Sequence, residues 1–385
     1  MRTGAAELAE RGVRKHLGPF SDWVEFARGR DVAQPAPAGP TRGRLGGILG
    51  FRFADEQPRE VIVDASWERD GIAGQEVSWS VGFGPRTRAR VLRPAGETGP
   101  LPGVIALHDH GGFKFHGLEK ISDGPEPSPD YLRVYRERYY GGRAWADELA
   151  RSGFTVVAHD TFCWGSRRFP LDAMPHQVRE VTDASRSLWD DGAAPSGIAR
   201  YNAAAGHHEH VVEKYCNLLG TTMAGVVSYE DRVALNYLLS RPDVDGTAVG
   251  CAGLSGGGAR SALLLATHDA IAAAVIVGMM TTYDALLDSH VADHTWMFYP
   301  SGWAGFGDWP ELAASRAPLP LLVQYDRYDE LFTEAGMRAA HEALGEHYAA
   351  AGGADAYRAE FYDGPHRFDI AMQQAAFSWL ADALG

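Results

Sequence analysis

Apolar and polar positions along the chain define two kinds of predicted strand. Three early runs alternate between apolar and polar residues, which is typical of antiparallel strands with one solvated face; they are residues 61–63, 76–81 and 87–92. Later runs are mostly continuous in apolar residues, which is typical of parallel strands buried on both faces. These are residues 103–107, 154–158, 247–254, 271–277 and 319–325, and residues 357–361 form the last predicted strand.

Helical segments are predicted between the buried strands. They cover residues 144–152, 229–239, 256–266, 333–344 and 371–384. Strands that alternate with helices after an antiparallel start predict an α/β fold, an open and mostly parallel sheet with helices on both faces. In such sheets ligands bind beyond the carboxyl ends of the strands.

The segments outside this pattern suggest an arm and two insertions. Residues 1–30 carry apolar side chains at roughly helical spacing, and the proline-rich residues 34–40 follow. We therefore predict an N-terminal helical arm with its linker over 1–40 and a main domain over 41–385. Residues from about 161 to 225 and from 279 to 318 show no clear period and are expected to be insertions. An arm of this kind packs on its own domain or on another subunit, which suggests a homodimer or larger homo-oligomer.

Composition argues against several partners and favours a location inside the cell. The 385 residues carry a net charge of −14, which argues against nucleic acid and against an anionic membrane surface. No apolar run reaches the length of a membrane span. The first ten residues hold charges where a signal peptide has its apolar core, so export by that route is not expected. The three cysteines lie far apart in the sequence, which favours free thiols and a cytoplasmic location.

A candidate nucleophile lies directly after the predicted strand 247–254. Residues 253–257, Gly-Leu-Ser-Gly-Gly, match the G-x-S-x-G pattern of a sharp strand-to-helix turn that exposes its serine. The flanking glycines let strand and helix pack closely around the strained Ser255. The alternatives are a glycine-rich turn without chemistry or a phosphate loop, although no Gly-Lys-Ser/Thr of a Walker loop follows.

A base and an acid follow the candidate serine in the chain. His366 comes just after the last strand, and Asp329 comes just after the strand before it. A serine hydroxyl needs a base to take its proton, and the base needs an acid that holds its tautomer and stabilises the imidazolium. The order Ser255, Asp329, His366 is that of one hydrolase architecture. Asp326 is the competing candidate for the acid.

Donors for an oxyanion are expected in the loop after strand 103–107. The amide of His110 is the first candidate and that of Gly111 the second, each paired with the amide of Gly256. The rival interpretation is a metal site, since residues 108–110 and 207–210 are rich in histidine and carboxylate. Neither stretch forms an ordered ligand motif, so we predict no metal and no cofactor, and we expect residues 207–210 to form a solvated face.

On these residues the chain resembles the α/β-hydrolase superfamily, and within it the dienelactone-hydrolase-like and acetyl-xylan-esterase-like bacterial hydrolases. The matching pieces are Leu107-His-Asp-His-Gly-Gly112, His159-Asp-Thr-Phe-Cys-Trp-Gly-Ser-Arg-Arg168, Gly253-Leu-Ser-Gly-Gly257, Asp329-Glu-Leu-Phe332 and Gly364-Pro-His-Arg-Phe368. The resemblance implies the α/β-hydrolase fold from about residue 86 to 385 and an oxyanion amide at His110. Dienelactone hydrolases proper use a cysteine nucleophile, so Ser255 argues against that activity.

These observations predict a serine hydrolase that cleaves a small-molecule carboxylic ester through an acyl-enzyme on Ser255. The same triad would serve an amidase, a peptidase or a C–C hydrolase, and a non-catalytic binding protein on a hydrolase fold is a further alternative. Apolar and aromatic side chains near the predicted strand ends and in the second insertion are candidates for the substrate pocket. They are Trp164, Met279, Trp296, Phe298 and Trp303.

Overall fold

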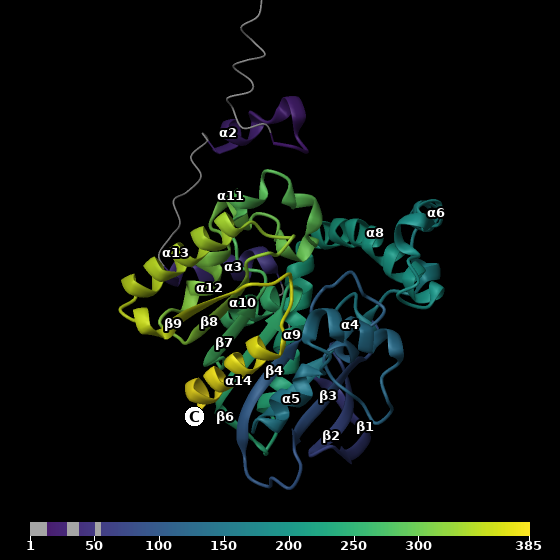
Figure 1. Ribbon diagram of the computed structural model, residues 1–385, viewed down its shortest axis with the longest axis vertical. Coiled ribbons are helices and arrows are strands. Elements are labelled where there is room, and N and C mark those ends of the chain that lie inside the picture. Colours follow the sequence, from purple (N-terminus) through teal and green to yellow (C-terminus); the bar gives the residue numbers. More distant parts are fainter. Residues whose placement is uncertain (1–13, 29–37, 51–54) are drawn as a thin grey trace, which may run out of the picture.

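The computed structural model describes residues 14–28, 38–50 and 55–385 (Figure 1). Its central feature is a sheet of nine strands. The strands are β1 Arg59–Arg69, β2 Ile72–Ser80, β3 Thr87–Pro94, β4 Leu101–Leu107, β5 Thr155–His159, β6 Val244–Leu254, β7 Ala273–Val277, β8 Leu321–Asp326 and β9 Tyr357–Tyr362. Every strand predicted from the apolar pattern is present, most of them with ends shifted by a few residues.

The sheet order places the candidate site residues at neighbouring strand ends. The order is β1-β2-β3-β5-β4-β6-β7-β8-β9, antiparallel as far as β5 and parallel from β5 to β9. Leu107 at the end of β4 is paired with Gly253 of β6, so the loop after β4 and the turn after β6 begin side by side. Asp326 at the end of β8 is paired with Tyr362 of β9. The mostly parallel sheet predicted from the sequence is confirmed.

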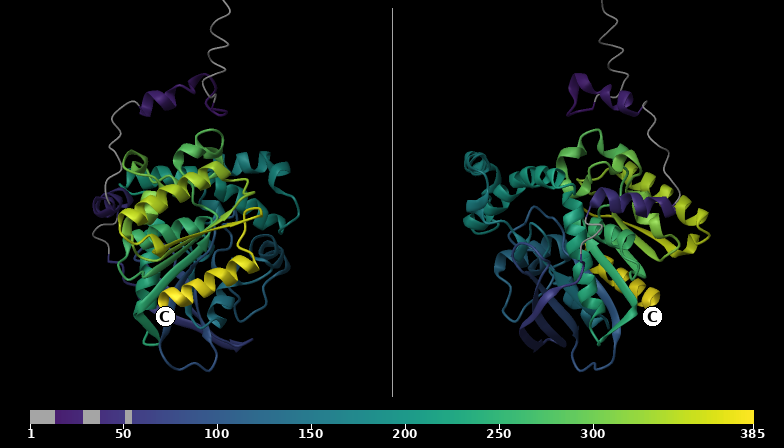
Figure 2. Two further views of the ribbon diagram at one scale, coloured as in Figure 1. Left: turned by 60° about the vertical axis from the view of Figure 1, so that its left-hand side comes forward. Right: turned by 180° about the vertical axis from the view of Figure 1, so that it is seen from behind.

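Helices cover both faces of the sheet (Figures 1 and 2). The longer ones are α3 Ala38–Leu49, α4 Asp130–Tyr140, α5 Trp145–Arg151, α6 His176–Ala184, α8 Ser196–Leu218, α9 Met223–Leu239, α10 Gly256–Thr267, α13 Glu334–Ala350 and α14 Ile370–Leu384. One apolar core joins the sheet to α5 and α14, and a second joins it to α3, α9, α10 and α13. Burial on both faces explains the continuous apolar runs of the parallel strands.

The N-terminal part differs from a single helical arm. Residues 1–13 of the predicted arm lie outside the described residues. Residues 14–28 hold a short 3-10 turn and the six-residue helix α2 Trp23–Arg28, and the Lys15 amide donates to the Asp288 carbonyl. Helix α3 begins at Ala38, inside the stretch predicted to be a linker, and buries Leu45 and Leu49 against the body.

The first insertion is largely helical, which the sequence pattern did not predict. Helices α6 and α8 project together from the body, on the right of Figure 1. The buried positions of α8 include Ala204, His208 and Glu209, so small and polar residues replace the large apolar side chains that mark an amphipathic helix. The second insertion consists of short turns and the small helices α11 Tyr283–Leu286 and α12 Trp309–Ala313. No helix in the described ranges has both the length and the apolar character needed to cross a membrane.

Candidate active site

Ser255 occupies a strained turn between β6 and α10. Its φ of 57° and ψ of −120° are a backbone conformation that non-glycine residues rarely adopt. The Ser255 amide donates to the Val277 carbonyl at 2.8 Å, which ties the turn to β7. A Cβ atom on Gly253 would lie 2.6 Å from the Leu107 carbonyl oxygen, and one on Gly257 would overlap the same oxygen. These glycines are therefore required by the close approach of the turn to β4.

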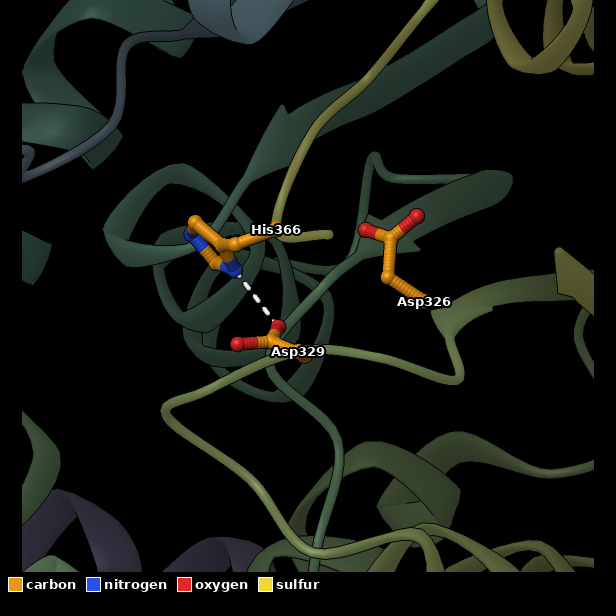
Figure 3. Close-up of side chains that lie close together, drawn as sticks. All are labelled: Asp326, Asp329 and His366. Atoms are coloured by element: carbon orange, nitrogen blue, oxygen red, sulfur yellow. Dashed lines mark hydrogen bonds and ion pairs between the residues drawn. The ribbon is translucent and has the colours of Figure 1, made fainter. Parts of the chain in front are cut away.

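His366 and Asp329 form a hydrogen-bonded pair. The distance between His366 Nδ1 and Asp329 Oδ2 is 2.6 Å (Figure 3). The other carboxylate oxygen of Asp329 accepts the Leu331 amide at 2.8 Å. The Asp329 side chain is fully buried and that of His366 is 15% exposed. The imidazole is thus oriented at Nδ1, which leaves Nε2 for proton transfer.

Asp326 has a different partner. Its Oδ2 accepts the Arg367 amide at 3.0 Å, and Figure 3 shows its carboxyl group beside the His366–Asp329 pair. The Phe368 amide also donates to the Tyr139 carbonyl at 2.8 Å. The two residues after His366 are therefore anchored, and Asp326 supports the turn rather than the imidazole.

The electrostatics of these groups differ. Burial disfavours the charged form of His366, but the hydrogen bond and the charge of Asp329 outweigh it and raise the pKa of the imidazole. Burial raises the pKa of Asp326 to about 7, against the stabilising hydrogen bond from the Arg367 amide. Asp329 is therefore suited to stabilise an imidazolium, whereas Asp326 gains and loses its proton near neutral pH.

One cavity of about 230 Å³ brings the candidate residues together. Its lining includes Ser255 and His366 as well as the candidate oxyanion residues His110, Gly111 and Gly256. A Cβ atom on Gly256 would lie 2.7 Å from the His110 nitrogen, so the two proposed amides are close neighbours. Gly111 has a φ of 55°, and a Cβ atom there would overlap the Tyr135 hydroxyl. Gly111 is therefore required by its backbone conformation and by the close approach of Tyr135.

Only some of the candidate pocket residues line the cavity. Met279 and Phe298 line the cavity, whereas Trp164, Trp296 and Trp303 are not among its lining residues. Trp164 is buried behind the loop after β4, with its ring centroid 5.2 Å from that of His110. Trp296 is 37% exposed and its Nε1 donates to His210 Nδ1 at 2.8 Å, while Trp303 is buried in the core.

Glu209 is a site residue that the sequence pattern did not predict. The sequence predicts a solvated face at residues 207–210, but His208 and Glu209 are buried on α8, and only His207 and His210 are exposed. The Glu209 carboxylate lies 2.9 Å from Lys114 Nζ and 3.1 Å from His110 Nε2. The charge of Lys114 and the hydrogen bonds from both partners overcome burial and hold the pKa of Glu209 well below its usual range.

The same carboxylate also holds the second insertion. It accepts the Trp296 amide at 3.0 Å and the hydroxyl of Thr295. Nearby, His294 Nε2 is 3.1 Å from the Leu331 carbonyl oxygen, and burial lowers the pKa of His294 to about 4. A neutral His294 therefore forms one wall of the cavity. A single acidic residue in a helix without apolar period gives no sequence signal for these long-range contacts.

Residues 108–110 and 207–210, the alternative metal site, do not form a cluster of metal ligands. Throughout residues 14–28, 38–50 and 55–385, the one group of three potential ligand side chains is Asp326, Asp329 and His366. The Asp109 carboxylate instead accepts hydrogen bonds from the hydroxyl groups of Tyr135 and Tyr140. The donor-rich stretch after β4 is thus used for internal hydrogen bonding.

Comparisons with known proteins agree with this architecture. No protein-family model matches the chain. It is 26% identical over 318 residues to a Bacillus subtilis (strain 168) protein named "Putative hydrolase YtaP", covering 82% of this chain and 90% of the relative.

Solved structures that are described as esterases share the same fold. One is described as a "putative acetyl xylan esterase" from Bacteroides fragilis, with a TM-score of 0.63 at 16% identity over 84% of this chain and 74% of that one. Another is a glucuronoyl esterase from Solibacter usitatus, with a TM-score of 0.59 at 15% identity over 89% and 92% of the two chains. Together with the sheet order and the turn at Ser255, these similarities show that the chain has the α/β-hydrolase fold.

Proposed function

We propose that the protein is a serine hydrolase that cleaves a small carboxylic ester through an acyl-enzyme on Ser255. The observation that carries this proposal is one cavity that joins a serine on a strained strand-to-helix turn with a histidine hydrogen-bonded to a buried aspartate. The fold neighbours named as esterases add support from chemistry on the same scaffold.

In the proposed acylation step, neutral His366 takes the proton of the Ser255 hydroxyl through Nε2 while the serine oxygen attacks the acyl carbon. Asp329 stabilises the imidazolium through Nδ1. The amides of His110 and Gly256 donate to the oxyanion of the tetrahedral intermediate. The intermediate collapses as the C–O bond to the alcohol breaks and His366 returns its proton to the leaving oxygen.

Deacylation repeats these roles with water in place of the serine. His366 removes a proton from the water, whose oxygen attacks the acyl carbon, and the ester bond to Ser255 breaks as the serine recovers its proton. The carboxylic acid is released and the enzyme returns to its starting state. This sequence requires no cofactor, and the chain's own groups supply every proton transfer.

The size of the cavity favours a small substrate. Its volume of about 230 Å³ is below the roughly 300–1,000 Å³ of pockets that hold drug-sized ligands. Met279 and Phe298 give it apolar walls beside the polar reaction centre. We therefore expect short acyl groups to be hydrolysed faster than long ones.

The test compares wild type with Ser255→Ala on the 4-nitrophenyl esters of acetate, butyrate and octanoate. Ser255→Ala is expected to lose activity on all three esters with an unchanged melting temperature, because Ser255 Oγ is needed only for the chemistry. Ser152→Ala, on an exposed position after α5, is the matched control and should retain full activity. Full activity of Ser255→Ala would refute the proposal.

The alternatives are separated by further substrates and a probe. An amidase, peptidase or C–C hydrolase would use the same residues and would prefer amide, peptide or diketone substrates in a parallel panel. A non-catalytic binding protein would leave Ser255 unlabelled by a fluorophosphonate probe. Ester hydrolysis faster than all other classes, together with labelling at Ser255, is the expected result.

Location and assembly are proposed on separate grounds. The three cysteines, Cys163, Cys216 and Cys251, are buried free thiols, which supports a cytoplasmic location. The segment 14–28 exposes Phe20, Trp23 and Phe26, which supports the predicted homo-oligomer. Cell fractionation and light scattering of the purified protein test these two proposals.

A further inference from the structure

Lys120 lies under the loop that supplies the proposed oxyanion amide. It ends the short turn Leu118–Lys120, and its side chain is fully buried. The ammonium group donates to the Asp109 carbonyl oxygen in a short hydrogen bond. It also lies 3.3 Å from the His110 carbonyl oxygen and 3.3 Å from the Asp109 carboxylate. A buried charge with three contacts to one loop is strongly localised.

The contact to the Asp109 carbonyl has a consequence for His110. That carbonyl and the His110 N–H belong to one planar trans peptide, so they point in opposite directions. His108 Nδ1 also lies 2.9 Å from the Asp109 carbonyl oxygen, and burial keeps the pKa of His108 well below its usual value. Two groups therefore hold the peptide from its carbonyl side, which fixes the direction of the N–H.

The nitrogen of this peptide lies beside the turn at Ser255. The His110 nitrogen would lie 2.7 Å from a Cβ atom on Gly256, the residue whose amide is the second proposed oxyanion donor. Among the described residues, the His110 amide donates to no backbone or side-chain acceptor. The amide is thus available to a substrate oxygen in the cavity.

The charge of Lys120 is balanced by a carboxylate of the same loop. Asp109 is its ion-pair partner, and the Asp109 carboxylate also accepts hydrogen bonds from the hydroxyl groups of Tyr135 and Tyr140. Burial raises the pKa of both tyrosines well above the usual value, so both hydroxyl groups remain donors. This arrangement keeps the ammonium group at the carbonyl.

We propose that Lys120 is a positioning residue of the oxyanion hole, whose ammonium group orients and polarises the Asp109–His110 peptide so that the His110 amide stabilises the oxyanion. A cation at the carbonyl end of a peptide strengthens hydrogen bonding at its N–H end. The proposal depends on the function proposed above. In this proposal Lys120 contributes to the stabilisation of the transition state without touching the substrate.

The test uses Lys120→Met and Lys120→Gln on 4-nitrophenyl acetate. Loss of one oxyanion donor costs about 10²–10³-fold in kcat, and a misdirected, less polarised amide should cost roughly 10- to 100-fold. We expect kcat to fall by that factor for Lys120→Met with KM changed less than threefold. Lys120→Gln retains a neutral donor and should lie between Lys120→Met and wild type.

A trifluoromethyl ketone inhibitor gives a second readout, because its hemiketal with Ser255 places an oxyanion in the same hole. Its inhibition constant should rise in Lys120→Met by the same factor as kcat falls. A purely structural role would lower the melting temperature without this parallel change. Unchanged kcat and inhibitor affinity in a folded Lys120→Met variant would overturn the proposal.

The double variant Asp109→Asn/Lys120→Met guards against failure of the single variants to fold, because it removes both buried charges together. If Lys120 only neutralises Asp109, the double variant will regain wild-type kcat, and the proposal is then wrong. A kcat that stays reduced in the folded double variant supports it. Ser255→Ala distinguishes the two levels, since activity in that variant refutes the proposed function itself, whatever Lys120 does.

Discussion

The most informative single change is Asp329→Asn. In the wild type, Asp329 Oδ2 is 2.6 Å from His366 Nδ1, so the imidazole carries its proton on Nδ1 and can accept one at Nε2. An amide at position 329 can donate its own hydrogen to Nδ1 and stabilise the opposite tautomer, whose Nε2 already bears a proton. That tautomer cannot act as the base for Ser255.

The expected magnitude follows from this change of tautomer and from the lost charge. The equivalent change in a Ser-His-Asp triad lowers kcat by about 10⁴-fold, which corresponds to about 5 kcal/mol in the barrier. Asp329 is fully buried, so water does not replace its hydrogen bond. Asp329 also raises the pKa of His366, so the remaining activity should reach half its maximum at a lower pH than in wild type.

The assay is the pH profile of kcat/KM for 4-nitrophenyl acetate, with Asp326→Asn as the matched control. Asp326 lies beside the pair but accepts the Arg367 amide, a bond that an Asn oxygen can also accept. Its replacement should therefore change kcat less than tenfold. The assignment of Asp329 as the acid would be refuted if Asp329→Asn lowered kcat less than tenfold. It would also be refuted if Asp326→Asn lowered kcat more than tenfold.

Two further predictions concern stability. The native pKa of Asp326 is raised to about 7, so the native state holds a proton that the unfolded chain releases above pH 4, and stability is lost as the pH rises toward 7. Asp326→Asn should therefore raise the free energy of unfolding by up to about 4 kcal/mol at pH 8 and by less at pH 4, as measured by urea unfolding. An equal effect at both pH values would contradict this prediction. Glu209→Gln leaves Lys114 buried without its ion partner and should cost about 3 kcal/mol by the same assay. Because Thr295 and Trp296 lose part of their anchor, its octanoate-to-acetate activity ratio should rise, and an unchanged ratio would show that Glu209 does not fix this wall.

Local patterns in the sequence were sufficient for the sheet and for the turn at Ser255. Continuous apolar runs identify strands buried on both faces, since few other environments accept them in that length. The glycines at 253 and 257 mark the close approach of the turn to Leu107, which the structure confirms. The apolar pattern does not predict helix α4 or the helices of the first insertion, because their buried faces include polar and small residues.

The composition of the cavity wall was less predictable. Phe298 and Trp303 lie in the same aromatic stretch and both pack in the core, yet only Phe298 also lines the cavity. Position in a stretch without period does not determine the direction of a side chain, because short turns place successive residues on different sides. The choice between these aromatic residues therefore came from packing.

The sequence by itself determined the fold class, the candidate serine and the order of serine, acid and histidine, because these depend on local periodicity and on turns after strands. Only the tertiary structure decided that Asp329 rather than Asp326 is hydrogen-bonded to His366, that Glu209 of the first insertion contacts the second insertion, and that Lys120 donates to the carbonyl of the Asp109–His110 peptide. Each of these contacts joins segments that meet only when the sheet has formed. Their geometry depends on distances of a few ångströms, to which hydrophobic periodicity is insensitive.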